Sequence, residues 1–223
     1  MRASDYIFDE VLIKDKLLSY DSPERCELSD ERFDKTAVVV LILPHKGKPY
    51  NLIMIKRTTR KGDRYSGEMA FPGGRYERKD KSLKETALRE TEEELGIPRE
   101  NIKILGCLDD HITPKFSVIT PLVAYIDQDQ AMTPQPEEVQ EIVKIPINFF
   151  AQRKRYRERT YMLKNNLIAV GKYKYRAPNN KTYVIFGATS HIIVSYLEAI
   201  YALRFMKKGA RRLTCSDFRQ TKR

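Results

Sequence analysis

The chain has 223 residues, and its 41 Lys and Arg against 30 Asp and Glu give a formal net charge of +11. This length suits one domain with short extensions, and the positive charge favours a polyanionic partner such as a phosphorylated substrate or, less favoured, RNA. No apolar run approaches the ~18 residues of a membrane helix, and the N-terminus is unlike a secretion signal. The three cysteines, Cys26, Cys107 and Cys215, are widely spaced, which excludes a disulfide framework or a zinc site. We therefore expect a cytoplasmic protein with no membrane contact.

The first third of the chain predicts a buried strand preceded by an extension. Residues 5–20 mix apolar and charged residues and predict a docking helix or a strand–helix pair, so we interpret 1–35 as an N-terminal extension packing on the core. Residues 37–43 (AVVVLIL) form a continuous, β-branched apolar run, which is typical of a strand buried on both faces. After a turn at 46–49, residues 50–57 predict the returning strand.

A basic loop, RTTRKGDR, follows at residues 57–64. It is either an ordinary solvated turn or a cradle for phosphate, because guanidinium groups match phosphate geometry. Its position just ahead of an acidic segment favours the second interpretation. Arg57 and Arg64 are therefore candidate substrate-binding residues.

The segment 71–98 predicts a short helix with defined ends. Ser82 and Glu85 have the spacing of a capping box that begins a helix. Gly96 stands where a left-handed C-cap belongs, and Pro98 prevents the helix from continuing. Just upstream, residues 72–74 (Pro-Gly-Gly) predict a tight turn.

Three glutamates of this helix, Glu90, Glu93 and Glu94, stand at i, i+3 and i+4 and would share one face. Like charges at this spacing destabilise a helix. A solvated acidic face is one explanation. Their place beside a glycine turn favours another, in which a hard cation such as Mg²⁺ or Mn²⁺ takes their oxygens as ligands and offsets the repulsion.

The same segment resembles the Nudix box, G-x5-E-x7-R-E-U-x-E-E-x-G-U, where U is aliphatic, and its second half matches residues 89–97 (RETEEELGI). Thr91 replaces the usual aliphatic residue, Asp80 takes the place of the early glutamate, and the spacer is one residue longer. This longer box is similar to the coenzyme A diphosphatase branch. The preceding IMIKRTTRKGDRYSGEMAFPGG is similar to that branch's LLTxRSxxLRxHxGxxAFPGG, with Tyr65 in place of the histidine, and Arg64 lies close to the place of its second arginine.

Beyond the box, residues 102–108 and 118–126 predict strands, and His111 between them is expected on the surface. ITPLVAYI resembles the branch's VTPVVAxI. The stretch 137–141 (EEVQE) resembles a Nudix E-V-x-E/D segment whose first glutamate reaches the metal site, which implies that Glu138 is a further ligand. The alternative is a surface residue at the start of a strand. Pro146 predicts a short helix to Phe150.

The last third predicts strands and one long helix. The run 153–159 (RKRYRER) is a solvated helix face or an RNA-binding segment. Residues 161–170 and 172–175 predict two strands joined near Gly171, and YVIFGAT resembles the branch's I-W-G-x-T, with Phe186 replacing tryptophan. Residues 190–206 predict the longest helix, with an apolar stripe, and 207–223 a basic tail.

The resemblance implies a Nudix-type α/β/α sandwich with a mixed β-sheet over residues 36–206. It implies metal-dependent hydrolysis of a small nucleoside diphosphate substrate, with coenzyme A or a derivative favoured over ADP-ribose, dinucleoside polyphosphates, nucleoside triphosphates or capped RNA. The intact glutamates argue against a third possibility, an inactive RNA-binding or regulatory module. The sequence leaves the oligomeric state open, and a dimer is compatible with it.

The resemblance also assigns roles by residue. The metal ligands, for Mg²⁺ or Mn²⁺, would be Glu90, Glu93, Glu94 and Glu138. The catalytic group would comprise Glu90 or Glu93 as general base, unless a glutamate outside the box takes that role, and Arg89, which orients the glutamates. The substrate-binding group would be Arg57, Arg64, Gly73 and Gly74.

Overall fold

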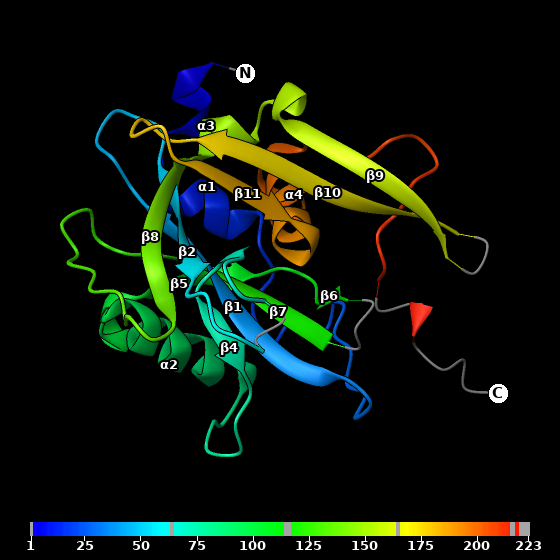
Figure 1. The fold of residues 1–223 in the computed structure, drawn as a ribbon, viewed down its shortest axis with the longest axis horizontal. Coiled ribbons are helices and arrows are strands. Elements are labelled where there is room, and N and C mark those ends of the chain that lie inside the picture. The colour runs from blue at the N-terminus through cyan, green and yellow to red at the C-terminus, as the bar shows by residue number, and fades with distance from the viewer. Residues whose placement is uncertain (1, 63–64, 114–116, 164–165, 215–216, 219–223) are drawn as a thin grey trace.

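The computed structural model describes residues 2–62, 65–113, 117–163, 166–214 and 217–218. A large mixed sheet and a smaller antiparallel sheet form the scaffold (Figure 1). The large sheet has the main strand order β3-β2-β1-β7-β5, and β4, β8 and β6 pair with β1, β2 and β7. Its strands are β1 (Asp34–Leu43), β2 (Asn51–Arg57), β3 (Met69–Ala70), β4 (Gly73–Arg75), β5 (Lys103–Cys107), β6 (His111–Ile112), β7 (Ser117–Tyr125) and β8 (Val139–Pro146).

Strand β1 is the centre of the molecule. It runs parallel to β7 and antiparallel to β2, and every residue from Ala37 to Leu43 is buried. Successive side chains of a strand point to opposite faces. Accordingly Ala37 and Val39 belong to the core under α2 (Leu83–Leu95), and Val38 and Val40 belong to the core under α4 (Gly187–Tyr201). This confirms the strand predicted to be buried on both faces and gives an α/β sandwich.

The smaller sheet is built from β9 (Tyr156–Leu163), β10 (Asn166–Arg176) and β11 (Thr182–Phe186), in the order β11-β10-β9. Two sequence predictions are wrong here. Strand β10 continues through Gly171 and is not interrupted there. Glycine is needed at this position because a Cβ would lie 2.3 Å from the Tyr156 hydroxyl, so only glycine leaves room for that ring. Residues 153–159 form not a helix but a 3-10 turn (Arg153–Arg155) that leads into β9.

Helix α4 begins earlier and ends earlier than predicted. It starts at Gly187 and stops at Tyr201, where Ala202 adopts a left-handed conformation with φ of 54°. Its apolar stripe packs against β10 and β11. A short helix α3 (Ile147–Phe150) follows Pro146, as the sequence predicts. A 3-10 turn (Arg99–Asn101) links α2 to β5.

The N-terminal segment lies against the domain through a 3-10 turn (Ala3–Tyr6) and helix α1 (Glu10–Asp15), whose Asp9 accepts from the Leu12 amide. Tyr6 and Ile13 are buried in the main core. Farther along, Arg25 donates to Asp110 over 2.7 Å, and both side chains are 1% exposed. Among the described residues, no helix combines the length and apolar character needed to cross a membrane.

Candidate active site

Helix α2 starts and stops where the sequence predicts. The Ser82 side chain accepts from the Glu85 amide over 3.3 Å, and Gly96 closes the helix at φ of 65°. Thr91, which occupies an aliphatic position of the box, is fully buried and donates to the Ala87 carbonyl over 2.7 Å. Because the helix itself satisfies this hydroxyl, threonine can replace an aliphatic residue in the core.

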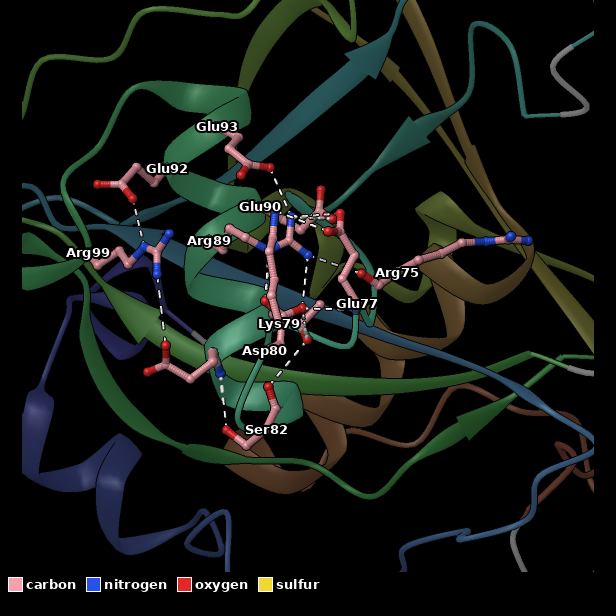
Figure 2. A network of polar contacts seen from close by, with 12 residues as sticks. Arg75, Glu77, Lys79, Asp80, Ser82, Arg89, Glu90, Glu92, Glu93 and Arg99 are labelled. Carbon is pink, nitrogen blue, oxygen red and sulfur yellow. Dashed lines mark hydrogen bonds and ion pairs between the residues drawn. The ribbon is translucent and has the colours of Figure 1, made fainter.

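Arg89 is the hub of the polar network on this helix (Figure 2). Its Nε and Nη2 donate to the two oxygens of Asp80 over 2.9 and 3.0 Å, and Nη2 also donates to the Arg75 carbonyl. Its Nη1 donates to Glu90 over 3.0 Å and to Glu93 over 2.9 Å. All five N–H groups of the guanidinium are thereby used. Arg89 therefore contacts both glutamates, and its role in orienting them for catalysis stays a prediction.

Asp80 is the anchor of that hub, a role that sequence reasoning missed. It is buried and also accepts from the Thr86 hydroxyl over 2.9 Å and from the Glu77 amide over 3.0 Å. Its bidentate pair with Arg89 holds the pKa of Asp80 well below its usual range. The signal was its place in the box, where a carboxylate recurs at the start of the spacer.

Glu94 lies at the floor of the site and is almost fully buried. Its Oε2 accepts from the Gly73 amide over 2.9 Å. Burial raises the pKa of Glu94 to about 8, against the lowering effect of that hydrogen bond, and the charges of Glu90 and Glu138 raise it further. Burial likewise raises the pKa of Glu90, with Arg89 opposing the shift.

The tight turn predicted at residues 72–74 is a bend at Pro72 followed by strand β4, which pairs with β1, and we keep the name glycine turn for residues 72–74. This segment is shaped around the carboxylates. A Cβ on Gly74 would lie 2.3 Å from the Glu90 carboxyl carbon, and a Cβ on Gly73 would lie 2.3 Å from the Ala37 carbonyl oxygen. Gly73 also has φ of 139°, which disfavours other residues. The turn therefore brings backbone amides against the acidic face of α2 at a distance that side chains would prevent.

A pocket of about 560 Å³ opens over this turn and the buried glutamates. The predicted site residues that line it are Arg57, Gly73, Gly74, Glu90, Glu94 and Glu138. Glu93 does not line the pocket; it is half-exposed and turned toward Arg89. Arg64 lies outside the described residues.

The far side of the pocket comes from segments that the sequence analysis did not assign to the site. It is lined by uncharged residues from the β6–β7 region and from the start of α4: Thr113, Ser117, Ile119, Ala188, Thr189 and Ile192. Tyr65 and Glu68 line it near the basic loop. His111, which was predicted on the surface, is partly buried. Its ring lies 5.4 Å from that of His191 on α4, and burial lowers the pKa of His111 to about 3.

The donors in this pocket fit a hard divalent cation. Within the described residues, no three His, Cys, Asp or Glu side chains are already grouped around one point. Arg89 and the Gly73 amide engage oxygens of Glu90 and Glu94. Nevertheless Glu90, Glu94 and Glu138 line one pocket, and the charges of Glu90 and Glu138 raise the pKa of Glu94. A cation with oxygen ligands would relieve this carboxylate repulsion.

Several known proteins have sequences similar to that of this chain. The chain is 27% identical to mouse peroxisomal coenzyme A diphosphatase NUDT7 over 162 residues, which cover 72% of this chain and 68% of that protein. It is 33% identical to the uncharacterized Nudix hydrolase NudL of Pectobacterium atrosepticum over 138 residues, covering 57% and 70%. It is 32% identical to human mitochondrial coenzyme A diphosphatase NUDT8 over 118 residues, covering 52% and 50%.

Among solved structures, a MutT/nudix family protein from Enterococcus faecalis is similar, with a TM-score of 0.52 at 20% identity over 79% of this chain and 65% of that one. At this identity the likeness shows the fold alone. The NUDIX domain profile matches residues 33–163, more than half of the chain, and includes the α2 glutamates and the glycine turn. The chain therefore belongs to the Nudix hydrolase family.

Proposed function

We propose that this enzyme hydrolyses the diphosphate bond of a nucleoside diphosphate-linked substrate, and that the substrate is coenzyme A or a derivative. The observation that carries the proposal is the joining of Glu90, Glu94 and Glu138 with Arg57 in one pocket beside the Gly73–Gly74 turn. The choice of coenzyme A is supported by the extended box, by the AFPGG segment that precedes it, and by the names of two relatives.

Glu90, Glu94 and Glu138 would hold Mg²⁺ or Mn²⁺, because carboxylate oxygens are the ligands these ions prefer. When bound, such a cation supplies positive charge that neutralises the diphosphate and acidifies a nearby water. Glu93 was also predicted as a ligand. In this proposal it contributes at the edge of the site, through the guanidinium that it shares with Glu90.

Arg57 would bind a phosphate oxygen. It lines the pocket, and its charge lowers the pKa of Glu94, so its guanidinium acts on the same volume as the glutamates. The close approach of Gly73 and Gly74 would let the diphosphate come near the acidic face of α2. Arg64 stays a predicted phosphate ligand on sequence grounds alone.

The general base was predicted to be Glu90 or Glu93. Glu90 lines the pocket, whereas Glu93 is half-exposed outside it, and this favours Glu90. Arg89 would set its orientation, since the guanidinium is itself locked by Asp80. Attack by water on phosphorus, in line with the departing phosphate, completes hydrolysis.

The test is a substrate panel with Mg²⁺ or Mn²⁺ and products resolved by mass. Coenzyme A should give phosphopantetheine and adenosine 3′,5′-bisphosphate, and chelation should stop the reaction. The panel also contains ADP-ribose, dinucleoside polyphosphates, nucleoside triphosphates and capped RNA. Faster turnover of any of these would reject coenzyme A as the substrate. If no member of the panel is turned over in a metal-dependent reaction, the proposed diphosphatase activity is rejected.

Two further expectations belong to this proposal. The cytoplasmic location rests on the cysteine pattern and contrasts with the peroxisomal and mitochondrial names of two relatives. Fractionation of cells that produce the full chain would test it. Sedimentation of the purified protein would test the dimer.

A further inference from the structure

The small sheet β9–β11 has two unlike faces. On the inner face, Tyr156, Tyr173, Tyr183 and Ile185 are buried in the main core with residues of α3 and α4. Because side chains alternate along a strand, the residues between them point the other way. That outward face lies away from α4 and takes no part in the pocket described above.

The outward face carries only cations among its charged residues. Five basic side chains from β9 and β10 alternate onto it and are exposed, and we call them the basic face: Arg157, Arg159, Lys172, Lys174 and Arg176. The only acid in the three strands is Glu158. It belongs to the inner face, where one of its oxygens is buried and the other accepts from the Lys207 amide.

This arrangement is unfavourable for the sheet by itself. The register sets Arg157 directly opposite Lys172 on the neighbouring strand, and like charges in that position destabilise a sheet. Among the described residues, no ion pair involves any member of the basic face. A bound polyanion would remove the repulsion, because each phosphate contributes a negative charge to these unpaired cations.

Exposed aromatic rings accompany the cations. Phe186, 44% exposed, stands opposite Lys172 on β11, and Tyr161, 54% exposed, follows Arg159 on β9. Both rings follow the same alternation as the basic residues. Aromatic rings on which bases stack, next to cations that follow the backbone, are the features of sites for single-stranded nucleic acid.

We propose that the basic face binds single-stranded nucleic acid, with phosphates on the five cations and bases on Phe186 and Tyr161. An anionic membrane would satisfy the cations but gives no reason for rings placed among them. A duplex would hide its bases from the rings. The proposal does not depend on the diphosphatase function, because the basic face and the pocket share no residue.

The test measures binding of a fluorescent 12-nucleotide oligouridylate by anisotropy, with chelator present so that no hydrolysis occurs. Five phosphate contacts predict that log K falls with log[salt] at a slope of about −3.5. The triple variant Arg157→Gln, Lys172→Gln, Lys174→Gln should bind about 100-fold more weakly at 0.1 M salt, with a slope reduced by about 2. Phe186→Ala and Tyr161→Ala should each weaken binding at least fivefold.

The matched control lowers the charge equally at exposed lysines elsewhere: Lys46→Gln, Lys48→Gln, Lys144→Gln. It should bind as the unmodified protein does, and thermal melting should show all variants folded. Equal losses of affinity in both triple variants would overturn the proposal, because binding would then depend on net charge and not on the basic face. Tighter binding of a 12-base-pair duplex, or binding to phosphatidylserine vesicles but not to the oligonucleotide, would also overturn it.

Discussion

The two walls of the pocket differ in composition and in origin. The wall formed by the glycine turn and α2 carries Glu90 and Glu94 on a segment of 23 residues, and Arg89 and Asp80 lock it from behind. The facing wall is uncharged and joins residues about 70 positions apart, such as Ser117 and Thr189. From this difference we expect one wall to supply the reaction chemistry and the other to select the group that is attached to the diphosphate.

The largest effect should follow from removing the charge at the floor of the acidic wall. Glu94→Gln should lower kcat by about 10²- to 10³-fold, because a ligand of the cation that stabilises developing charge is lost. Steady-state assays with the active substrate measure it. Glu92→Gln is the control on the same helix, since Glu92 pairs with Arg99 away from the pocket. Full activity of the Glu94 variant would contradict the assignment of Glu94 as a metal ligand.

The helix that supplies part of the uncharged wall should make the protein sensitive to acid through His191, which does not itself line the pocket. His191 on α4 accepts from the Gly171 amide over 3.0 Å, and burial followed by the nearby Arg212 charge lowers its pKa to about 4. The unfolded chain, with a histidine pKa near ~6.5, therefore binds a proton before the folded one. Stability from this group is present above pH ~6.5 and falls by on the order of 3 kcal/mol as the pH drops toward 4.

Denaturant unfolding at several pH values, compared with His191→Gln, isolates this contribution. The glutamine amide oxygen can accept the Gly171 hydrogen bond without titrating. The difference between the two proteins should shrink or reverse as the pH falls from 6.5 to 4. Parallel pH profiles would show that His191 does not account for the acid response.

Loss of the Asp80–Arg89 pair behind the acidic wall should lower kcat less than loss of Glu94. Asp80→Asn removes one charged acceptor of Arg89 and should lower kcat about 10- to 100-fold, as loss of a group that orients metal ligands does. Binding of the product nucleotide without metal should change little, because Asp80 does not line the pocket. Asp80→Glu should restore part of the activity. Equal loss of kcat and of thermal stability, without rescue, would indicate a structural role only.

The smallest effect should come from a conservative change in the facing wall. Thr189→Val keeps the shape of the side chain but removes its hydroxyl from the pocket. We expect kcat to stay within twofold and the ratio of kcat/KM between two substrates to change by a few-fold, equivalent to ~1 kcal/mol. A loss of kcat as large as that of Asp80→Asn would contradict the division between the walls.

Much of the acidic wall could be predicted because its determinants are local. The ends of α2 follow from Ser82 and Gly96, and the spacing of its glutamates follows from helix geometry. The role of Asp80 was missed, although its place in the box pointed to a carboxylate there. Its partner Arg89 lies nine residues away across the loop before the helix, and only the folded loop brings the two side chains into a bidentate pair.

The errors fall where neighbours distant in sequence decide the outcome. Gly171 was expected to separate two strands, but the Tyr156 ring, which lies on the adjacent strand, requires glycine within one continuous strand. His111 was expected at the surface, yet it lies beside His191 of α4, 80 positions later in the chain. Neither contact leaves a periodic signal in the sequence.

The central strand, the boundaries of α2 and the residues of its acidic face follow from the sequence, because these features depend on side-chain periodicity and capping within a few residues. The contact of Glu93 with Arg89 is likewise local, because the two residues stand at i and i+4 of α2. Tertiary packing decided which acids share a pocket and brought Glu138, the residue before β8, to the site. It also built the uncharged wall and the basic face, because both arise from the pairing of strands and helices whose separation along the chain no local rule encodes.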